Sequence, residues 1–368
     1  MKIGINFLSF RSYQGTEVFA KHLISELLEL DHKNEYVIFA SAYLPEEMKL
    51  KADNLIVESI NINPEKTIQM GIYQQIALPF KLLKSGITKF FAPLPSIPVF
   101  YTGKKIITIH DCAYDRFNEY KNLAGRLYIK SMYISGKYLC DTIITDSNFA
   151  KNELIELYNI KPERIKVVYP AVPELPHVDD AFINETKHRF NITHQYFLYV
   201  GITRPRKNIT GLLKAFKLLA GKHTDIQLVL AGKIDTSFID IEKEIHALGL
   251  EKHVIQTGFV SDMQKSAIYK GAIALSFPSY YEGFGIPVIE AQSIGTPVIA
   301  SNTSSLPEVA QDGALYINPE NIEDITNAME KLLDDAQRKE LIENGYKNVQ
   351  RFSWKNSAAQ LMNVINDE

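Results

Sequence analysis

Residues 272–300 read AIALSFPSYYEGFGIPVIEAQSIGTPVIA. The segment begins and ends with short apolar runs that are typical of buried strands. Between them lie a loop with two glycines and a stretch in which Pro287 suits the first turn of a helix, because its missing N–H costs nothing there. The segment is therefore expected to form a strand, a helix and a second strand, the repeating unit of a parallel sheet.

The same alternation continues along nearly the whole chain and predicts an α/β fold with helices on both faces of parallel sheets. The expected strands are KIGINF, YVIFA, ITKFF, KIITI, TIIT and IKVVY in the first half, and YFLYV, IQLVLA, HVIQT, AIALSF, PVIA and ALYI in the second. Helices fill the gaps between them. The helix in NITGLLKAFKLLAG, for example, is expected to open at Asn208 and close at Gly221.

The alternation stops after VVYPAVPELP, where three prolines and a polar stretch extend to about His188. Such a stretch is typical of a linker between domains. We therefore expect a domain at residues 1–172, a linker at 173–189, a second domain at 190–352 and a closing helix at 353–368. Both domains are expected to be doubly wound and Rossmann-like, and to face each other across a cleft that binds the ligand.

The composition indicates a folded, soluble protein. Hydrophobic residues make up 46% of the 368 residues and charged residues 23%, so a large core is expected. Two cysteines provide no disulfide framework, which favours a reducing compartment. The N-terminus does not match a signal peptide, and no run approaches the roughly 18 apolar residues of a membrane span. The expected location is the cytoplasm.

The net charge of −3 argues against a nucleic-acid-binding protein, but the charge is uneven. Eleven basic and three acidic residues lie between Lys66 and Lys137. This stretch is either a solvated basic face or a patch that meets a pyrophosphate-bearing acceptor or the anionic inner membrane surface, which would make the protein a peripheral membrane protein.

The loop after AIALSF holds the strongest candidate site, because ligands bind beyond the carboxyl ends of parallel strands. Gly285 lets the backbone approach a ligand, and the amides of Phe284, Gly285 and Ile286 would point out of a helix N-terminus, which favours phosphate. Glu282 and Glu290 could accept hydrogen bonds from a sugar ring and a ribose. By themselves, the two carboxylates could equally be a loop charge and a solvated helix residue.

Polar residues also follow other predicted strands. Gly201 and the loop ITRPRKN follow YFLYV, and Arg206 and Lys207 in this loop could clamp a diphosphate or could simply be solvated. His110 follows KIITI and is either a core histidine or a residue of the ligand site, and Asp146 follows TIIT.

Two further features point to structure rather than chemistry. Ser305 and Glu308 match a capping box at the start of a helix. Cys112 and Cys140 have no neighbours at metal-ligand spacing, so we expect small core residues and no metal site.

In their order, these motifs resemble the retaining, nucleotide-sugar-dependent glycosyltransferases of family 4, which have the GT-B fold. The resemblance covers essentially the whole chain and rests on TIHD, ITDSNFAKNEL, VGITRPRKNI, TGFV, the Glu-x7-Glu element and GTPVIASNTSSLPEV. It implies that the C-terminal domain holds a nucleotide sugar and that the N-terminal domain supplies most of the acceptor site. It also implies that no metal or other cofactor is bound.

The resemblance assigns roles in the nucleotide site. Arg206 and Lys207 would bind the donor diphosphate, and Glu290 would hold the ribose. Phe259 and Val260, in the TGFV turn, would lie beside the nucleobase.

The resemblance also assigns residues near the reacting carbon. Glu282 and the backbone of Phe284 and Gly285 would bind the transferred sugar, and His110 would contact the donor sugar or the acceptor. Many family members carry paired glycines after the first strand, whereas the loop here reads YQGTEV, which weakens the assignment of Gly15 to the distal phosphate.

The implied reaction is transfer of a hexosyl group with retention, by front-face attack in which the leaving phosphate takes the acceptor's proton. The motif forms favour GDP-mannose as donor and a glycan or lipid-linked oligosaccharide as acceptor. The alternatives are a nucleotide-sugar epimerase of the same fold and a non-catalytic nucleotide-sugar-binding partner. A phosphorylase would be much longer, and a nicotinamide dehydrogenase would carry G-x-G-x-x-G after the first strand.

Overall fold

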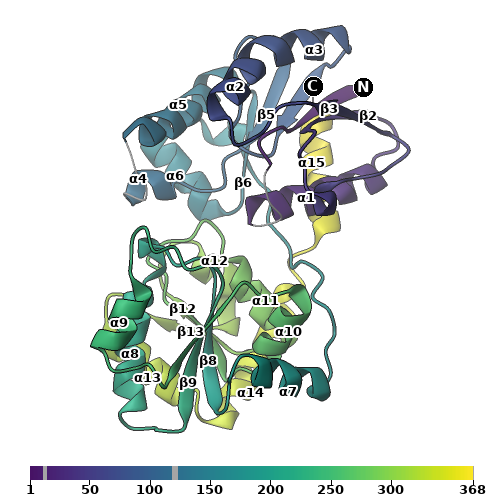
Figure 1. Cartoon of the computed structure of the whole chain (residues 1–368). Helices are drawn as coiled ribbons and strands as arrows, with labels where there is room; N and C mark the ends of the chain where they lie inside the picture. The colour runs from purple at the N-terminus through teal and green to yellow at the C-terminus, as the bar shows by residue number, and fades with distance from the viewer. Residues whose placement is uncertain (11–14, 118–122, 368) are drawn as a thin grey trace. The chain divides into compact units, whose positions relative to one another are not determined.

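The computed structural model describes residues 1–10, 15–117 and 123–367, and it divides into two compact units, each with its own sheet (Figure 1). The first unit comprises Met1–Arg116, Tyr120–Pro170 and Phe352–Glu368, and the second comprises Phe117–Glu119 and Ala171–Arg351. The chain thus returns to the first unit for its last helix.

The described residues of the first unit form a seven-stranded sheet in the order β3-β2-β1-β4-β5-β6-β7, with every neighbouring pair parallel. Its strands are β1 (Lys2–Phe7), β2 (Glu35–Ser41), β3 (Leu55–Ile60), β4 (Lys89–Ala92), β5 (Lys104–Thr108), β6 (Thr142–Thr145) and β7 (Ile165–Val167). Its helices are α1 (Thr16–Leu30), α2 (Thr67–Ile72), α3 (Leu78–Lys84), α4 (Ala113–Arg116), α5 (Leu123–Leu139), α6 (Asn148–Tyr158) and α15 (Trp354–Asn366).

Two apolar layers cover the two faces of this sheet. Buried side chains of α2, α3, α5 and α6 form one layer, and those of α1 and α15 form the other. The buried Lys89 at the start of β4 donates from Nζ to the carbonyl oxygens of Ile365 and Asp367, each at 2.6 Å, and so satisfies the last turn of α15. The closing helix therefore completes the core of the first unit.

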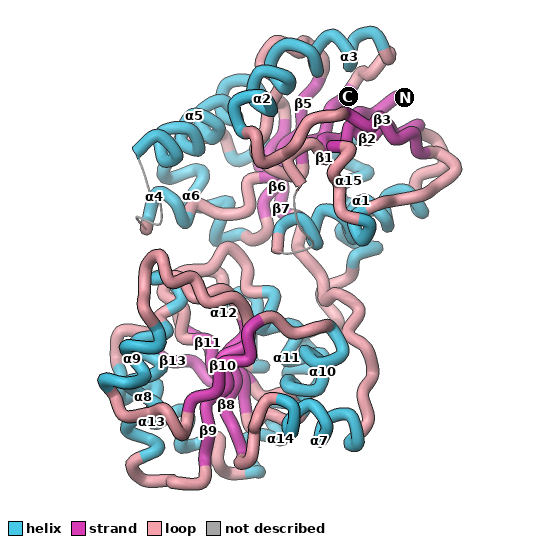
Figure 2. Tube along the Cα trace, viewed as in Figure 1, coloured by secondary structure: helices cyan, strands magenta, loops and turns pink. Residues whose placement is uncertain are grey.

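The described residues of the second unit form a six-stranded sheet in the order β10-β9-β8-β11-β12-β13, again with parallel neighbours. Its strands are β8 (Gln195–Val200), β9 (Ile226–Ala231), β10 (Val254–Gly258), β11 (Ala274–Phe277), β12 (Val298–Ser301) and β13 (Leu315–Ile317). Its helices are α7 (Asp180–Arg189), α8 (Ile209–Ala220), α9 (Ile241–Ala247), α10 (Asp262–Lys270), α11 (Ile286–Ile294), α12 (Leu306–Ala310), α13 (Ile322–Lys331) and α14 (Asp335–Val349). Figure 2 shows helices on both sides of these strands.

Local sequence explains several boundaries. Asn208 caps α8, since its side chain accepts from the amide of Gly211, and Gly221 follows the last turn, as predicted. Pro287 lies in the first turn of α11, also as predicted.

The sequence analysis missed one strand. Residues 55–60, LIVESI, form β3 at the edge of the first sheet. Most of this strand is exposed or half-buried, so it lacks the continuous apolar run that marks the central strands. The segment predicted as a linker contains α7. Ile183 of this helix packs with Val178, which precedes it, and with Ala267 of α10.

Candidate functional site

Glu282 lies in the loop after β11 and joins the two cations predicted to bind a diphosphate. Its Oε2 lies 3.0 Å from Nη1 of Arg206, and its Oε1 lies 2.5 Å from Nζ of Lys207. The carboxylate is 5% exposed. Burial alone would raise the pKa of Glu282, but the positive charges of Lys207 and Arg206 outweigh it and hold the pKa below its ordinary value. The carboxylate is therefore ionised and shared between two cations.

Hydrogen bonds join the loop that carries Arg206 and Lys207 to the loop after β11. The amide of Tyr280 donates to the carbonyl oxygen of Arg206 at 2.8 Å, and Nη1 of Arg206 donates to the carbonyl oxygen of Tyr281 at 3.0 Å. Nζ of Lys207 also lies 5.1 Å above the ring centre of Phe277, at the end of β11. Arg204 does not join this group, because it pairs with Asp235 at 3.1 Å. The strand ends β8 and β11 are neighbours, so the sheet itself brings the two loops together.

Ser305 holds the same turn from the loop after β12, which corrects the capping-box prediction. Ser305 precedes α12 but has helical backbone angles, and its side chain makes no cap hydrogen bond. Its buried hydroxyl instead lies 2.9 Å from the carbonyl oxygens of both Glu282 and Phe284. The neighbouring Ser304 accepts from the amide of Glu282 at 3.1 Å. Both serines therefore shape the turn around the carboxylate.

Gly285 turns the chain into α11. Its φ of +107° lies in the region that favours glycine, and an added Cβ would meet Cδ2 of Leu306 at 2.8 Å. Phe284 is buried, and Ile286 begins the helix. Among the described residues, no side chain caps this N-terminus. The N-terminus of α11 therefore follows Glu282, the partner of Arg206 and Lys207, by a few residues along the chain, and a phosphate site at its amides stays a prediction.

Glu290, the second predicted carboxylate, is held by α10. Its Oε1 lies 2.9 Å from Nζ of Lys265, and its Oε2 accepts from the hydroxyl of Tyr269 at 2.9 Å. Burial would lower the pKa of Lys265, but the charge of Glu290 outweighs it and raises that pKa. Sequence reasoning missed Lys265 and Tyr269. Their spacing of four along α10 puts them on one helical face, which was the available signal.

Three glycines end neighbouring strands of the second sheet. Gly201 follows β8, Gly232 follows β9 and Gly258 ends β10, all with positive φ. A Cβ on Gly232 would lie 2.4 Å from the carbonyl oxygen of Gly201, so only glycine fits there. Sequence reasoning missed Gly232. The two residues predicted to lie beside the nucleobase come directly after Gly258. Phe259 is 74% exposed, and Val260 is half-buried.

His110 lies in the first unit, where the ends of three neighbouring strands meet. Its Nδ1 lies 2.8 Å from Oδ2 of Asp146, which follows β6, and its Nε2 lies 3.1 Å from the carbonyl oxygen of Pro93, which follows β4. Phe19 contacts the ring edge-on. Both ring nitrogens face acceptors, an arrangement that favours the doubly protonated, positively charged imidazole.

The electrostatics of this pair support the charged form. Burial alone would lower the pKa of His110, but the charges of Asp146 and Asp111 outweigh it and raise that pKa. Burial also raises the pKa of Asp146. The second oxygen of Asp146, Oδ1, is buried and accepts no hydrogen bond from the described residues.

Gly15 also belongs to the first unit. It has a φ of +54° and precedes α1, and an added Cβ would meet nothing within 4 Å. Tyr13 and Gln14 of the same loop lie outside the described residues. The structure therefore brings Arg206, Lys207 and Glu282 into contact within the second unit, while His110 and Gly15 are in the first.

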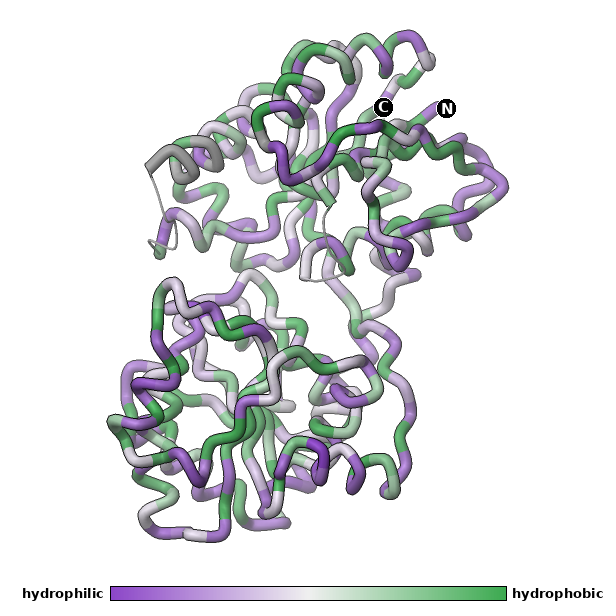
Figure 3. The backbone as a smooth tube through the Cα atoms, viewed as in Figure 1, coloured by the Kyte–Doolittle hydropathy of each residue, from purple (hydrophilic) through white to green (hydrophobic). Residues whose placement is uncertain are grey.

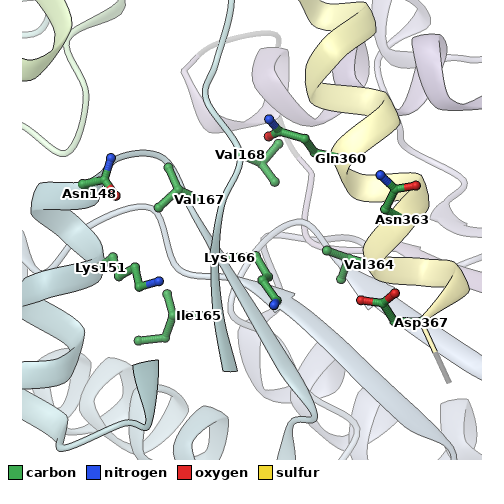
Figure 4. A pocket seen from close by; sticks show the side chains of 10 residues that line it. All are labelled: Asn148, Lys151, Ile165, Lys166, Val167, Val168, Gln360, Asn363, Val364 and Asp367. Carbon is green, nitrogen blue, oxygen red and sulfur yellow. The ribbon is translucent and has the colours of Figure 1, made fainter. Parts of the chain in front are cut away.

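A pocket of about 400 Å3 opens elsewhere in the first unit (Figure 4). Its lining comes from the start of α6, from β7 and from α15: Asn148, Lys151, Ile165, Lys166, Val167, Val168, Gln360, Asn363, Val364 and Asp367. None of the predicted site residues lines it. Within residues 1–10, 15–117 and 123–367, no group of three or more His, Cys, Asp or Glu side chains could hold a metal ion. In the same part of the chain, no helix has the length and apolar character needed to cross a membrane.

Two family models match the chain. The model described as "Glycosyltransferase Family 4" matches residues 13–174, and the model described as "Glycosyl transferases group 1" matches residues 181–348.

Individual proteins agree with this match. O-antigen chain mannosyltransferase B of Escherichia coli is 30% identical over 269 residues, which cover 71% of this chain and 70% of that protein. The serotype-specific mannosyltransferase WbdA of Escherichia coli is 33% identical over 225 residues, which cover 59% of this chain but only 28% of WbdA. The solved structure of Anabaena HepE with UDP and glucose has a TM-score of 0.79 at 17% identity, with 100% of both chains covered.

Proposed function

The chain belongs to the glycosyltransferases of the GT-B fold, and from this premise we propose that it moves a hexosyl group, with retention, from a nucleotide-diphosphate sugar to a glycan or lipid-linked oligosaccharide. We place it in family 4 and propose GDP-mannose as the donor. The name of the Escherichia coli relative, an O-antigen chain mannosyltransferase, supports mannose and a polysaccharide product. The proposal includes catalysis without a bound metal or other cofactor, and a cytoplasmic location at the inner membrane surface.

The contact of Glu282 with Arg206 and Lys207 beside the N-terminus of α11 is the observation that carries this proposal. Two half-buried cations and a row of helical amides suit a diphosphate, because both supply positive potential. The carboxylate between them suits the hydroxyl groups of a sugar, which donate hydrogen bonds to it. A diphosphate joined to a sugar fits both halves of this arrangement.

The chemistry follows from the charges that develop. Cleavage of the bond between the anomeric carbon and the phosphate oxygen leaves positive charge on the sugar and a new negative charge on the nucleoside diphosphate. Arg206 and Lys207 stabilise that negative charge, and donors of this kind are typically worth ~3 to 4 kcal/mol each. The acceptor oxygen attacks from the face that the diphosphate leaves, and a phosphate oxygen takes its proton, so the product forms without a protein nucleophile.

Other residues orient the substrates in this proposal. Glu290, fixed by Lys265 and Tyr269, accepts the ribose hydroxyls. The exposed ring of Phe259 lies against the nucleobase, next to Val260. Gly201, Gly232 and Gly258, at the ends of neighbouring strands, carry no side chains and so leave room for the nucleotide.

His110 has a separate role. Its two ring nitrogens are engaged by Asp146 and Pro93, so in this proposal the ring contacts the donor sugar or the acceptor near the reacting carbon through its face and its positive charge. Gly15, at the start of α1, is proposed for the distal phosphate.

The test combines binding and turnover. A thermal-shift panel of nucleotide sugars identifies the donor, because a ligand at 100 times its dissociation constant adds ~2.7 kcal/mol to stability. We expect the largest shift with GDP-mannose, and we expect sugar transfer to continue when a metal chelator is added.

Lys207→Ala and Glu282→Ala should each lower turnover at least about a hundredfold with the fold intact, and Lys252→Ala, at an exposed residue, serves as a control. Near-normal turnover in both variants would refute the assignment, and binding without turnover on any acceptor would favour a non-catalytic partner.

A further inference from the structure

The loop after β8, which carries Arg206 and Lys207, lies between the loops after β9 and β11, because the strands run in the order β9-β8-β11. Figure 3 shows hydrophilic stretches in the loops of this unit and largely hydrophobic strands. On the β11 side, the partners of the two cations are Glu282 and backbone groups of its loop. On the β9 side, a second set of contacts begins at Arg204. The proposed function gives these contacts no role.

Arg204 and Asp235 form an ion pair that joins the loops after β8 and β9. Nη2 of Arg204 lies 3.1 Å from Oδ2 of Asp235, and its guanidinium lies 4.9 Å from the ring centre of Phe238 in the same loop as Asp235. The amide of Asp235 donates to the hydroxyl of Thr203 at 2.8 Å. The amide of Thr203 donates in turn to the carbonyl oxygen of Lys233 at 3.2 Å. Backbone and side-chain contacts therefore join the same two loops.

This ion pair is more enclosed than an ordinary surface pair. The side chain of Arg204 is 32% exposed, that of Asp235 is 16% exposed, and Thr203 is buried. Fully exposed pairs contribute little, because solvent screens the charges and both side chains must lose freedom. Here the ring of Phe238 and the hydrogen bond to Thr203 already restrict the two partners, so the pair can fix the position of Arg204.

The backbone passes this anchoring on to the two cations. Arg204 directly precedes the one-turn 3₁₀ helix Pro205–Lys207, and its carbonyl oxygen accepts from the amide of Lys207 at 2.9 Å. Pro205 restricts the backbone at the start of this turn. Asn208 follows the turn and caps α8. The short segment that carries Arg206 and Lys207 is therefore held at both ends, by Arg204 and by α8.

We propose that Arg204 and Asp235 are positioning residues that hold Arg206 and Lys207 in place for the donor diphosphate, an inference that rests on the proposed function. The ion pairs to Glu282 occupy the same cationic groups that a diphosphate needs, so they cannot anchor those groups once the ligand is bound. The pair of Arg204 with Asp235 does not compete with the ligand and persists. Cations that are already in position stabilise the leaving diphosphate without reorganisation.

The rival role is direct contact of Arg204 with the diphosphate, and variants of Asp235 separate the two. If the ion pair positions the loop, Asp235→Ala and Arg204→Ala have similar effects, because each removes the same pair. If Arg204 binds the diphosphate, Asp235→Ala leaves donor binding unchanged or tighter, since it removes a nearby negative charge. Arg204→Glu/Asp235→Arg restores the pair with its charges exchanged, and it recovers activity only under the positioning role.

The test uses the full chain, calorimetric titration with GDP-mannose and UDP-glucose, and initial rates of sugar transfer. Arg204→Ala and Asp235→Ala should each lower kcat about tenfold or more and weaken donor binding severalfold, because small displacements of charge-stabilising groups are costly. The variant with exchanged charges should recover most of both losses. As a control, Lys222→Ala breaks the exposed pair of Lys222 with Glu330 in the same unit and should match the wild type.

A double-mutant cycle with Lys207→Ala separates positioning from general stability. If the ion pair acts through Lys207, Arg204→Ala should lower kcat by a smaller factor in the Lys207→Ala variant than in the wild type. A purely structural contribution would lower the melting temperature of Arg204→Ala and leave the two effects on kcat independent.

Three results would overturn the inference: unchanged kcat in Arg204→Ala, wild-type donor binding in Asp235→Ala, or independent effects in the cycle. Its failure is distinguishable from that of the proposed function. If Lys207→Ala is impaired and Asp235→Ala is not, only the positioning role fails. If the wild type binds neither nucleotide sugar, or if Lys207→Ala keeps near-normal turnover, the proposed function fails and the positioning role fails with it.

Discussion

Asp146→Asn offers a direct test of the role proposed for His110. The carboxylate of Asp146 lies 2.8 Å from Nδ1 of the histidine, and its charge is the strongest influence that raises the pKa of His110. At an effective dielectric constant of about 20, two unit charges at this distance attract each other by roughly 6 kcal/mol. Asparagine keeps the shape and an oxygen that can accept from Nδ1, but it removes the charge. The substitution therefore isolates the electrostatic contribution of Asp146.

The sign of the effect follows from the remaining neighbours. Burial, the largest single influence on the pKa of His110, favours the neutral ring, and in the variant the charge of Asp111, the carbonyl of Pro93 and the uncharged oxygen of the asparagine oppose it less strongly than Asp146 does in the wild type. The pKa of His110 should then fall, and the ring should be neutral near pH 7. If the positive charge of the ring stabilises the transition state near the reacting carbon, turnover at pH 7 should drop about tenfold to a hundredfold.

The assay is the pH dependence of kcat, together with an NMR titration of the histidine rings. In the wild type, activity should persist until the pH rises through the raised pKa of His110. In Asp146→Asn, this alkaline decline should shift to lower pH, and acidification should restore part of the lost turnover. The exposed Asp53→Asn is a control from the same unit. An unchanged titration of His110, or a loss of turnover that is the same at every pH, would refute the electrostatic role.

Three further substitutions probe the second unit. Gly285→Ala should lower Tm by several degrees in calorimetry, because the new Cβ meets Leu306 at 2.8 Å and the strained backbone costs ~1 to 3 kcal/mol; Gly71→Ala, which meets nothing within 4 Å, should not. Ser305→Ala should raise KM for the donor and cost ~1 to 3 kcal/mol in denaturant unfolding, since it leaves buried carbonyl oxygens without their donor, and a change in neither quantity would contradict this role. Lys265→Met should weaken nucleotide binding at least severalfold in calorimetric titration while kcat changes little, whereas a fall in kcat alone would contradict the proposed ribose contact.

The sequence was sufficient for the features that depend on local pattern. Central strands such as β8 and β9 are buried on both faces, so their apolar runs identify them directly. The edge strand β3 was missed because one side of its ladder and much of its surface meet solvent, which relaxes the demand for apolar residues. Burial pattern thus predicts the middle of a sheet better than its edge.

Tertiary partners were harder to predict than strand ends. His110 and Asp146 could be placed at the ends of neighbouring strands, but the hydrogen bond between them depends on the strand order β5-β6. Lys265 meets Glu290 only because α10 packs beside α11. Ser305 fits a local capping motif, yet its hydroxyl forms longer-range bonds to the turn at Glu282. A short motif indicates which local hydrogen bonds a residue can form, but tertiary packing determines the partner that it has in the folded protein.

Under the proposed function, the carboxylate of Glu282 needs a physical reason, because a negative charge beside a diphosphate weakens binding. In the empty site, it balances the positive charges of the half-buried Arg206 and Lys207. When a diphosphate arrives, its oxygens can take over both cations and release the oxygens of Glu282. Those oxygens then need donors, and the hydroxyl groups of the sugar on the same diphosphate supply them. The exchange couples recognition of the phosphates to recognition of the sugar. After transfer, the nucleoside diphosphate has no sugar whose hydroxyl groups donate to Glu282, so the carboxylate lacks hydrogen-bond donors. This weakens binding of the product and favours its release.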